Sequence, residues 1–106
     1  MAIIILPDAQ ADLFALQDYM LEKWGAATWD VAENEIFEAL ARIESGILDG
    51  APIQELAAIG MTDYLNVLTS HHKLVYRRID QTIYVYLVAA HRQDYPTILM
   101  NRMLRR

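Results

Sequence analysis

Two runs of β-branched and aromatic residues near the C-terminal end dominate the hydrophobic pattern of this chain. Residues 73–79 and 82–90 flank the short Asp80-Gln81 link, and such a pair of runs predicts an antiparallel β-hairpin. The second run is apolar at consecutive positions as well as at alternate ones. We therefore expect residues 82–90 to form the most deeply buried strand, with other elements packed on both of its faces.

Helical periodicity precedes the hairpin. Residues 8–24 and 27–47 place apolar side chains at spacings of three and four, which predicts two amphipathic helices. Trp24, Trp29 and Ile47 fall within these apolar stripes, so we expect all three in the core. Because Gly25 and a very short link separate the two segments, the sequence indicates an antiparallel helical hairpin that lies on a sheet.

Shorter segments complete the expected order. Residues 2–6 have the composition of a first strand, and residues 61–69 that of the strand before the hairpin. The stretch 48–60 is rich in glycine and proline and is expected to be irregular, whereas residues 97–106 are predicted to form a short helix. The fold class is thus α+β with the order β-α-α-β-β-β-(α): an antiparallel helical hairpin packed on a small, mostly antiparallel sheet, in one domain over residues 1–106.

Composition adds three expectations. Of the 106 residues, 55% are apolar and 22% are charged, which is a hydrophobic balance for a small domain and favours a partner chain that covers part of the surface. The chain has no cysteine, so disulfides and thiolate metal sites are excluded. No apolar run approaches the roughly 20 residues that span a bilayer. We expect a cytoplasmic protein that has no contact with a membrane and binds no cofactor.

The charge is unevenly distributed along the chain. Residues 1–70 carry two basic and twelve acidic side chains, a balance of −10, whereas residues 71–106 carry seven basic and two acidic ones, a balance of +5. An anionic partner is therefore expected to meet the C-terminal third of the protein.

Several of these features occur together in one known group of proteins. The element order, the pattern A-x-A-D-L-x-x-L-x-D-Y that begins at Ala9 and leads to Trp24-Gly25, and the hairpin H-H-K-L-V-Y-R-R-I-D-x-T-I-Y-V-Y-L-V-A-A-H-R-Q-D-Y together resemble the RelE/ParE superfamily. Its members are toxins of bacterial type II toxin–antitoxin, or plasmid stabilisation, modules. The resemblance covers nearly the whole chain and implies a compact toxin that a cognate antitoxin neutralises by wrapping its C-terminal segment over it.

The superfamily implies two alternative activities. ParE-like toxins inhibit DNA gyrase and are paired with ribbon-helix-helix antitoxins of the ParD kind. RelE-like toxins are endoribonucleases that cleave messenger RNA on the ribosome with a set of Lys, Arg and Tyr residues. This chain has Lys73 where that set has an Arg, Tyr64 and Asn66 where it has lysines, and Asp94 and Ile98 near its Arg and Tyr.

These departures remove positively charged side chains that would stabilise the phosphate of the RNA during cleavage. The resemblance therefore favours a non-enzymatic ParE-like gyrase inhibitor. The alternative is a RelE-like ribonuclease that uses Lys73, Arg77, His91 and Arg92. A third hypothesis is an inactive relative that is kept as an antitoxin-binding module.

The candidate contact residues lie in the basic C-terminal third. The residues expected to bind the antitoxin or the target are Lys73, Arg77, His91, Arg92, Tyr95, Arg102 and Arg105. Alternation along a strand predicts that Lys73 and Arg77 share one face of the sheet, opposite Leu74, Tyr76 and Arg78. We interpret His71 and His72 as exposed turn histidines, the glutamates from Glu33 to Glu44 as a solvated helix face, and the chain as having no metal site.

Overall fold

The computed structural model describes residues 2–104, in which helices and strands follow the predicted order with two short additions. The N-terminal elements are β1 (Ala2–Ile5), α1 (Pro7–Lys23) and α2 (Ala26–Ser45). The remaining elements are β2 (Ala51–Pro52), α3 (Gln54–Ala57), β3 (Leu65–Leu68), β4 (His72–Ile79), β5 (Thr82–Ala90) and α4 (Tyr95–Leu104). The α+β class is confirmed.

Within these residues the strands form a five-stranded sheet of order β1-β5-β4-β3-β2. β1 pairs in parallel with β5, and the other neighbouring strands pair antiparallel. The predicted hairpin is β4–β5, and β5 lies between β1 and β4 rather than at an edge. Its prediction as a strand buried on both faces is confirmed, because its side chains enter one apolar core on each side of the sheet.

A β-bulge shifts the alternation of side chains within β5. Val75 pairs with Leu87 but the next residue, Tyr76, pairs with Val85, so that β5 has one extra residue at this point. On one side of the bulge Val88 faces the core beneath the long helices, and on the other side Val85 faces the same core. An uninterrupted alternation would have sent these two side chains to opposite faces.

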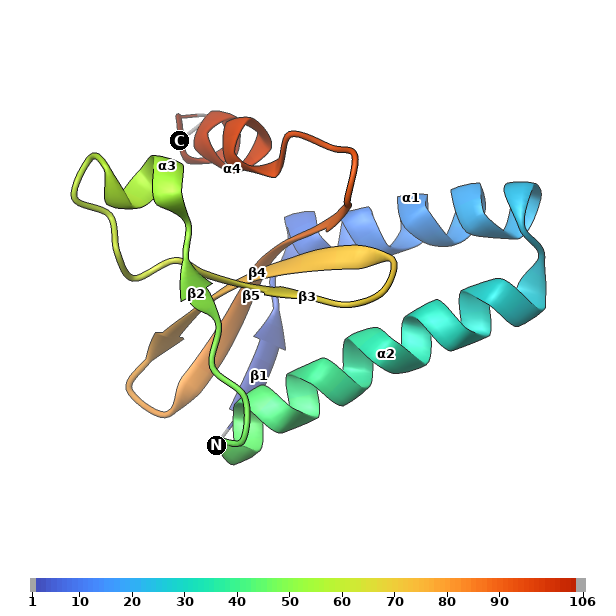
Figure 1. Cartoon of the computed structure of the whole chain (residues 1–106), viewed down its shortest axis with the longest axis horizontal. Coiled ribbons are helices and arrows are strands. Elements are labelled where there is room, and N and C mark those ends of the chain that lie inside the picture. The colour runs from blue at the N-terminus through green and yellow to red at the C-terminus, as the bar shows by residue number, and fades with distance from the viewer. Residues whose placement is uncertain (1, 105–106) are drawn as a thin grey trace.

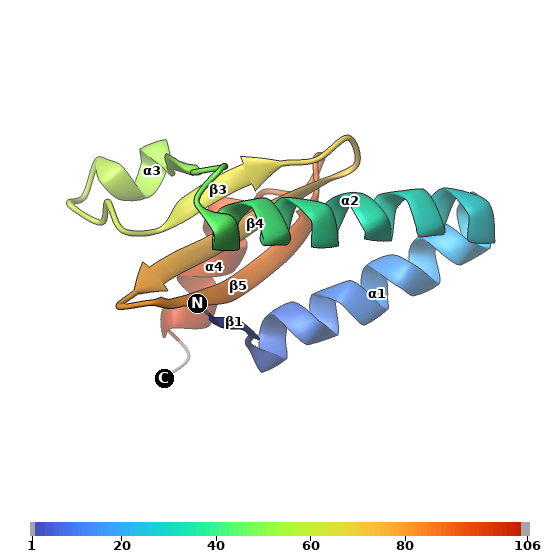
Figure 2. The same cartoon turned by 90° about the horizontal axis from the view of Figure 1, so that it is seen from below.

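The helical hairpin of α1 and α2 covers one face of the sheet (Figures 1 and 2). Trp29, Ile36 and Ile43 of α2 pack there against Tyr76 and other strand residues, as the apolar stripe predicted. Gly25, with a φ of +92°, allows the tight turn between the two helices, a backbone conformation that side-chain-bearing residues rarely adopt.

Two residues of the predicted stripes are not in the core. Trp24 is 60% exposed and Ile47 is 79% exposed, so their prediction as core residues is wrong. Trp24 directly follows the last residue of α1, at the end of the helical hairpin that extends beyond the sheet (Figure 1). Ile47 comes after Gly46, whose left-handed backbone ends α2, so the helical direction of side chains no longer applies to it. Helical periodicity gives the direction of a side chain but not how far the covered surface reaches.

The opposite face of the sheet is covered by α3 and α4 (Figure 1). Leu56 of α3 and Leu99 of α4 are buried there against Val75, Leu87 and neighbouring residues. The C-terminal helix is confirmed, although it begins at Tyr95 and the predicted end at residues 105 and 106 lies outside the described residues. β2 and α3 occupy the stretch expected to be irregular. No helix among residues 2–104 combines the length and the apolar character that membrane crossing requires.

Candidate functional site

Lys73 and Arg77 lie on the face of β4 that α4 covers. Leu74 and Tyr76 enter the core beneath the helical hairpin, so the predicted division between the two faces is confirmed for these residues. The Nζ atom of Lys73 lies 4.6 Å from the centre of the Tyr95 ring. No carboxylate in the described part of the chain pairs with Lys73, so its charge remains available to a partner.

Arg77 is held by three neighbours on the same face. Its guanidinium lies 2.7 Å from a carboxylate oxygen of Asp63 and donates a 3.4 Å hydrogen bond to the hydroxyl of Tyr86. The guanidinium carbon also lies 5.0 Å from the centre of the Tyr64 ring. Burial raises the pKa of the Tyr64 hydroxyl, so this ring stays neutral beside the cation. The charge of Arg77 is thus largely compensated within the fold.

His91 and Arg92 follow the last residue of β5 and turn towards other elements. The Nε2 atom of His91 lies 2.9 Å from the backbone oxygen of Thr69. Arg92 donates a 3.2 Å hydrogen bond to the hydroxyl of Tyr19 in α1, and its guanidinium lies 4.7 Å from the centre of that ring. Lys23 donates a second hydrogen bond of 3.0 Å to the same hydroxyl. These bonds, from Lys23 first and then from Arg92, lower the pKa of Tyr19.

Arg102 lies inside the fold. Its guanidinium forms a two-pronged pair with Asp12 of α1, at 2.6 Å and 2.9 Å, and donates a further hydrogen bond to the backbone oxygen of Tyr86. The hydrogen bonds to Asp12 raise the pKa of Arg102. Arg102 therefore connects α4 to α1 and β5. Arg105, which was also predicted to bind a partner, lies outside the described residues.

The four residues of the ribonuclease hypothesis divide into two groups. His91 and Arg92 line one hollow of about 300 Å³. Lys73 and Arg77 contact Tyr95 and Tyr64 on the α4 face and do not line that hollow. The catalytic role of the four residues stays a prediction, but their side chains do not surround a single phosphate-sized space.

His72 is buried, and its interpretation as an exposed turn residue is wrong. It is the first residue of β4, it is 1% exposed, and its ring meets the Trp29 ring edge-on at a centre-to-centre distance of 6.4 Å. Burial, followed by the nearby His71 and His91, lowers the pKa of His72 to about 4. The signal was present in the sequence, because His72, Leu74 and Tyr76 occupy alternate positions of one strand.

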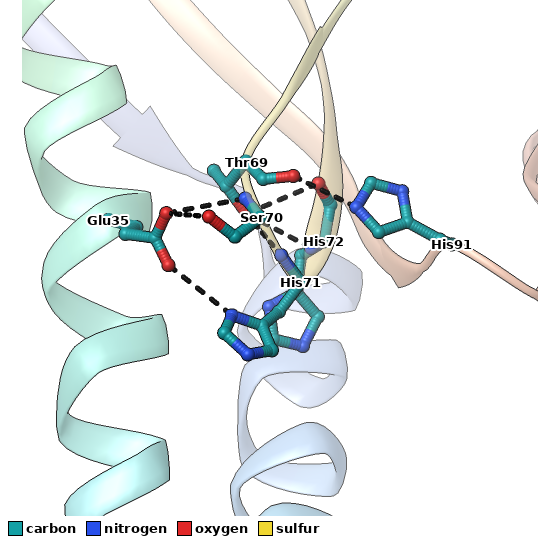
Figure 3. A network of polar contacts seen from close by, with 6 residues as sticks. All are labelled: Glu35, Thr69, Ser70, His71, His72 and His91. Carbon is teal, nitrogen blue, oxygen red and sulfur yellow. Dashed lines mark hydrogen bonds and ion pairs between the residues drawn. The ribbon is translucent and has the colours of Figure 1, made fainter.

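A polar network fixes the turn between β3 and β4 (Figure 3). Glu35 of α2 accepts hydrogen bonds from the backbone and the hydroxyl of Ser70, and its other oxygen lies 3.3 Å from Nδ1 of His71. The hydrogen bond from the Ser70 hydroxyl is the main cause that lowers the pKa of Glu35. Glu35 was expected as part of a solvated helix face; its side chain is 30% exposed, and its carboxylate also anchors the turn.

The outer surface of the helical hairpin carries unusually exposed apolar side chains. A groove of about 160 Å³ between the two helices, here called the helical groove, is lined by Gln10, Leu13, Phe14, Gln17, Trp29, Glu33 and Phe37. Phe14 is 67% exposed and Phe37 is 47% exposed. Contiguous apolar surface of this kind marks interaction sites on small proteins. The sequence placed charged residues on the outer faces of both helices and gave no indication of this groove.

The described residues offer no evident metal centre. Among residues 2–104, no three His, Cys, Asp or Glu side chains come together in an arrangement that could hold a metal ion.

Comparison with known proteins adds information on the family and the fold. The family model of the ParE toxin of the type II toxin–antitoxin system parDE matches residues 3–95. The chain is similar in structure to a chain of the chromosomal ParDE toxin–antitoxin system from P. aeruginosa, with a TM-score of 0.68 and 16% sequence identity over 85% of this chain and 95% of the other. The isolated E. coli RelE toxin aligns with a TM-score of 0.49 and 19% identity over 95% and 96% of the two chains. The comparison with curated proteins gave no significant match.

Proposed function

We propose that this chain, which belongs to the ParE toxin family of type II toxin–antitoxin systems, is the toxin of such a pair. A ParD-like ribbon-helix-helix antitoxin neutralises it. The free toxin inhibits DNA gyrase in the cytoplasm. The observation that carries the proposal is the family match, which extends over residues 3–95. The similar structure from P. aeruginosa belongs to a ParDE system, which supports an antitoxin as the partner of this chain as well.

The exposed helical groove supports the same proposal. An amphipathic segment of the antitoxin that laid its apolar side chains against Phe14 and Phe37 would remove this surface from water. The groove also contains Glu33, so a basic residue of the antitoxin fits beside the apolar ones. Acidic residues of the antitoxin would meet Lys73, a cation without a carboxylate partner in the described part of the chain.

Binding of the antitoxin can be tested by isothermal titration calorimetry with the product of any ribbon-helix-helix reading frame that overlaps or immediately precedes this gene. The variant with Phe14→Ser and Phe37→Ser should bind at least about tenfold more weakly, because buried apolar anchors dominate such interfaces. Val31→Ser is the matched control, since Val31 is 56% exposed on the same hairpin but does not line the groove. Equal affinity of the double variant and the control would contradict this docking surface.

The target is tested separately with purified toxin and DNA gyrase in a supercoiling assay. We expect inhibition that the antitoxin reverses when it is added in equal amount. Unchanged supercoiling at micromolar toxin would remove gyrase from the proposal, whereas codon-phased cuts in translated messenger RNA would replace it with the ribonuclease alternative.

A further inference from the structure

A second concave surface lies away from both the helical groove and the α4 face. It is the hollow of about 300 Å³ near the end of β5, here called the histidine hollow. Its walls come from the last turns of α1, from the turn between β3 and β4, and from the residues that follow β5. They comprise Leu16, Tyr19, Met20, Trp24, Ser70, His71, His72, Ala90, His91 and Arg92. Small-molecule sites begin at about this size.

Positive charge converges on one side of the hollow. Arg92 and Lys23 both donate hydrogen bonds to the Tyr19 hydroxyl, at 3.2 Å and 3.0 Å. Neither cation pairs with a carboxylate among residues 2–104. The carboxylate of Glu35 is already bonded to Ser70 and His71. In a chain of net charge −5, this is a local site that favours an anion.

The imidazole rings add hydrogen-bonding capacity that the fold does not use. The Nε2 atom of His91 faces the Thr69 carbonyl and therefore carries a proton, which leaves Nδ1 of that ring for a ligand. His72 is 1% exposed, and its Nδ1 has no hydrogen-bond partner among the described residues. Because buried polar atoms are nearly always paired, this Nδ1 is a hydrogen-bonding position that the fold leaves unused.

An exposed indole completes the wall. Trp24 is 60% exposed although most tryptophans lie largely buried, and it borders the hollow together with Arg92. Proteins that bind nucleotides without base preference combine a cation, which contacts the phosphate, with an exposed aromatic ring, on which the base stacks.

We propose that the histidine hollow binds a nucleoside phosphate. The phosphate group contacts Arg92, a ribose hydroxyl donates a hydrogen bond to Nδ1 of His91, and the base stacks on Trp24. The site lies outside the helical groove, so its occupation does not depend on the proposed toxin function.

The test uses calorimetric titration of the full chain with adenosine monophosphate, inorganic phosphate and adenosine as separate probes. We expect one saturable site for adenosine monophosphate, with weaker binding of either half alone. Arg92→Gln should weaken binding about tenfold or more, since it removes a charge-assisted hydrogen bond. Trp24→Ala should weaken it by a similar factor, because stacking on an aromatic ring contributes to every bound base.

Lys73→Gln is the matched control, because it removes the same charge from the opposite face of the sheet. Its affinity for adenosine monophosphate should equal that of the parent chain, and circular dichroism should show that all variants are folded. The absence of saturable binding at millimolar nucleotide would overturn the proposal. An equal loss of affinity in Lys73→Gln and Arg92→Gln would also overturn it, because the attraction would then come from the overall charge. Phosphate that binds as tightly as the nucleotide would overturn the role of Trp24.

Discussion

The pair between Arg102 and Asp12 is the interaction most open to a quantitative test. Their side chains are 20% and 16% exposed, and the two residues lie 90 positions apart in the chain. Asp12 also accepts a 3.0 Å hydrogen bond from the backbone N–H of Val88. Asp12→Ala therefore removes the carboxylate that joins α1, β5 and α4, and it leaves a largely buried guanidinium with only the more distant carboxylate of Asp8, at 4.0 Å, as counter-ion.

The expected cost follows from these contacts. Removing one partner of a buried, hydrogen-bonded ion pair costs about 3–5 kcal/mol, and the residual exposure of both groups places this case near the lower end, at about 3 kcal/mol. For a chain of this size that corresponds to a fall of roughly 12 °C in Tm. Urea denaturation followed by circular dichroism measures the free energy of unfolding directly.

Glu38→Gln provides the matched control. It breaks the Glu38–Arg42 pair within α2, whose side chains are 65% and 58% exposed, and should cost less than about 0.5 kcal/mol. A double-mutant cycle with Arg102→Gln then separates the pair from the hydrogen bond to Val88, with an expected coupling of about 1–3 kcal/mol. A loss in Asp12→Ala no larger than in Glu38→Gln, or a coupling near zero, would refute the reasoning.

Three further predictions concern other contacts. Because the folded pKa of His72 is about 4, below the unfolded value of 6.5, the unfolded chain binds the extra proton in this interval. His72 should therefore cost stability progressively as the pH falls from about 6.5 to 4, by up to about 3 kcal/mol, and His72→Phe should remove this part of the pH dependence measured by urea denaturation. Tyr76→Phe deletes the 2.7 Å hydrogen bond from the Gly50 backbone N–H to the Tyr76 hydroxyl and should cost about 1–2 kcal/mol in the same assay. Gly50→Ala, made alone, should also destabilise the chain, because an added Cβ would lie 2.7 Å from the backbone oxygen of Asn66. Thermal unfolding would detect the lower Tm.

The sequence predicted those parts of the fold that depend on local pattern. The two long helices, the hairpin and the burial of β5 follow from periodicities of three to four residues or of two. β2 and α3 were missed because they span two and four residues in a stretch punctuated by glycine and proline. The bulge in β5 was also out of reach, since a run that is apolar at every position is compatible with several registers.

For the candidate site, the sequence predicted the face of the sheet on which side chains lie but not the residues with which they pair. The faces of Lys73 and Arg77 follow from strand alternation, and this prediction is confirmed. The partner of Arg77 in the β3 region and the partner of Arg102 in α1 are set by tertiary packing, which no local pattern encodes. The helical groove escaped notice for a related reason: Phe14 and Phe37 have the residue type of the core, and only the position of the sheet shows that they face away from it.

The parallel pairing of β1 with β5 has a consequence for biosynthesis. β1 has its only neighbour within residues 2–104 in β5, Thr82–Ala90, which is translated much later than β1. Closing so long a loop is entropically costly and slow, so the nascent chain cannot complete its sheet until β5 has left the ribosome. A polypeptide released before β5 would carry an open edge at β4 and a β1 without any partner, and we expect it to be degraded instead of reaching an active state.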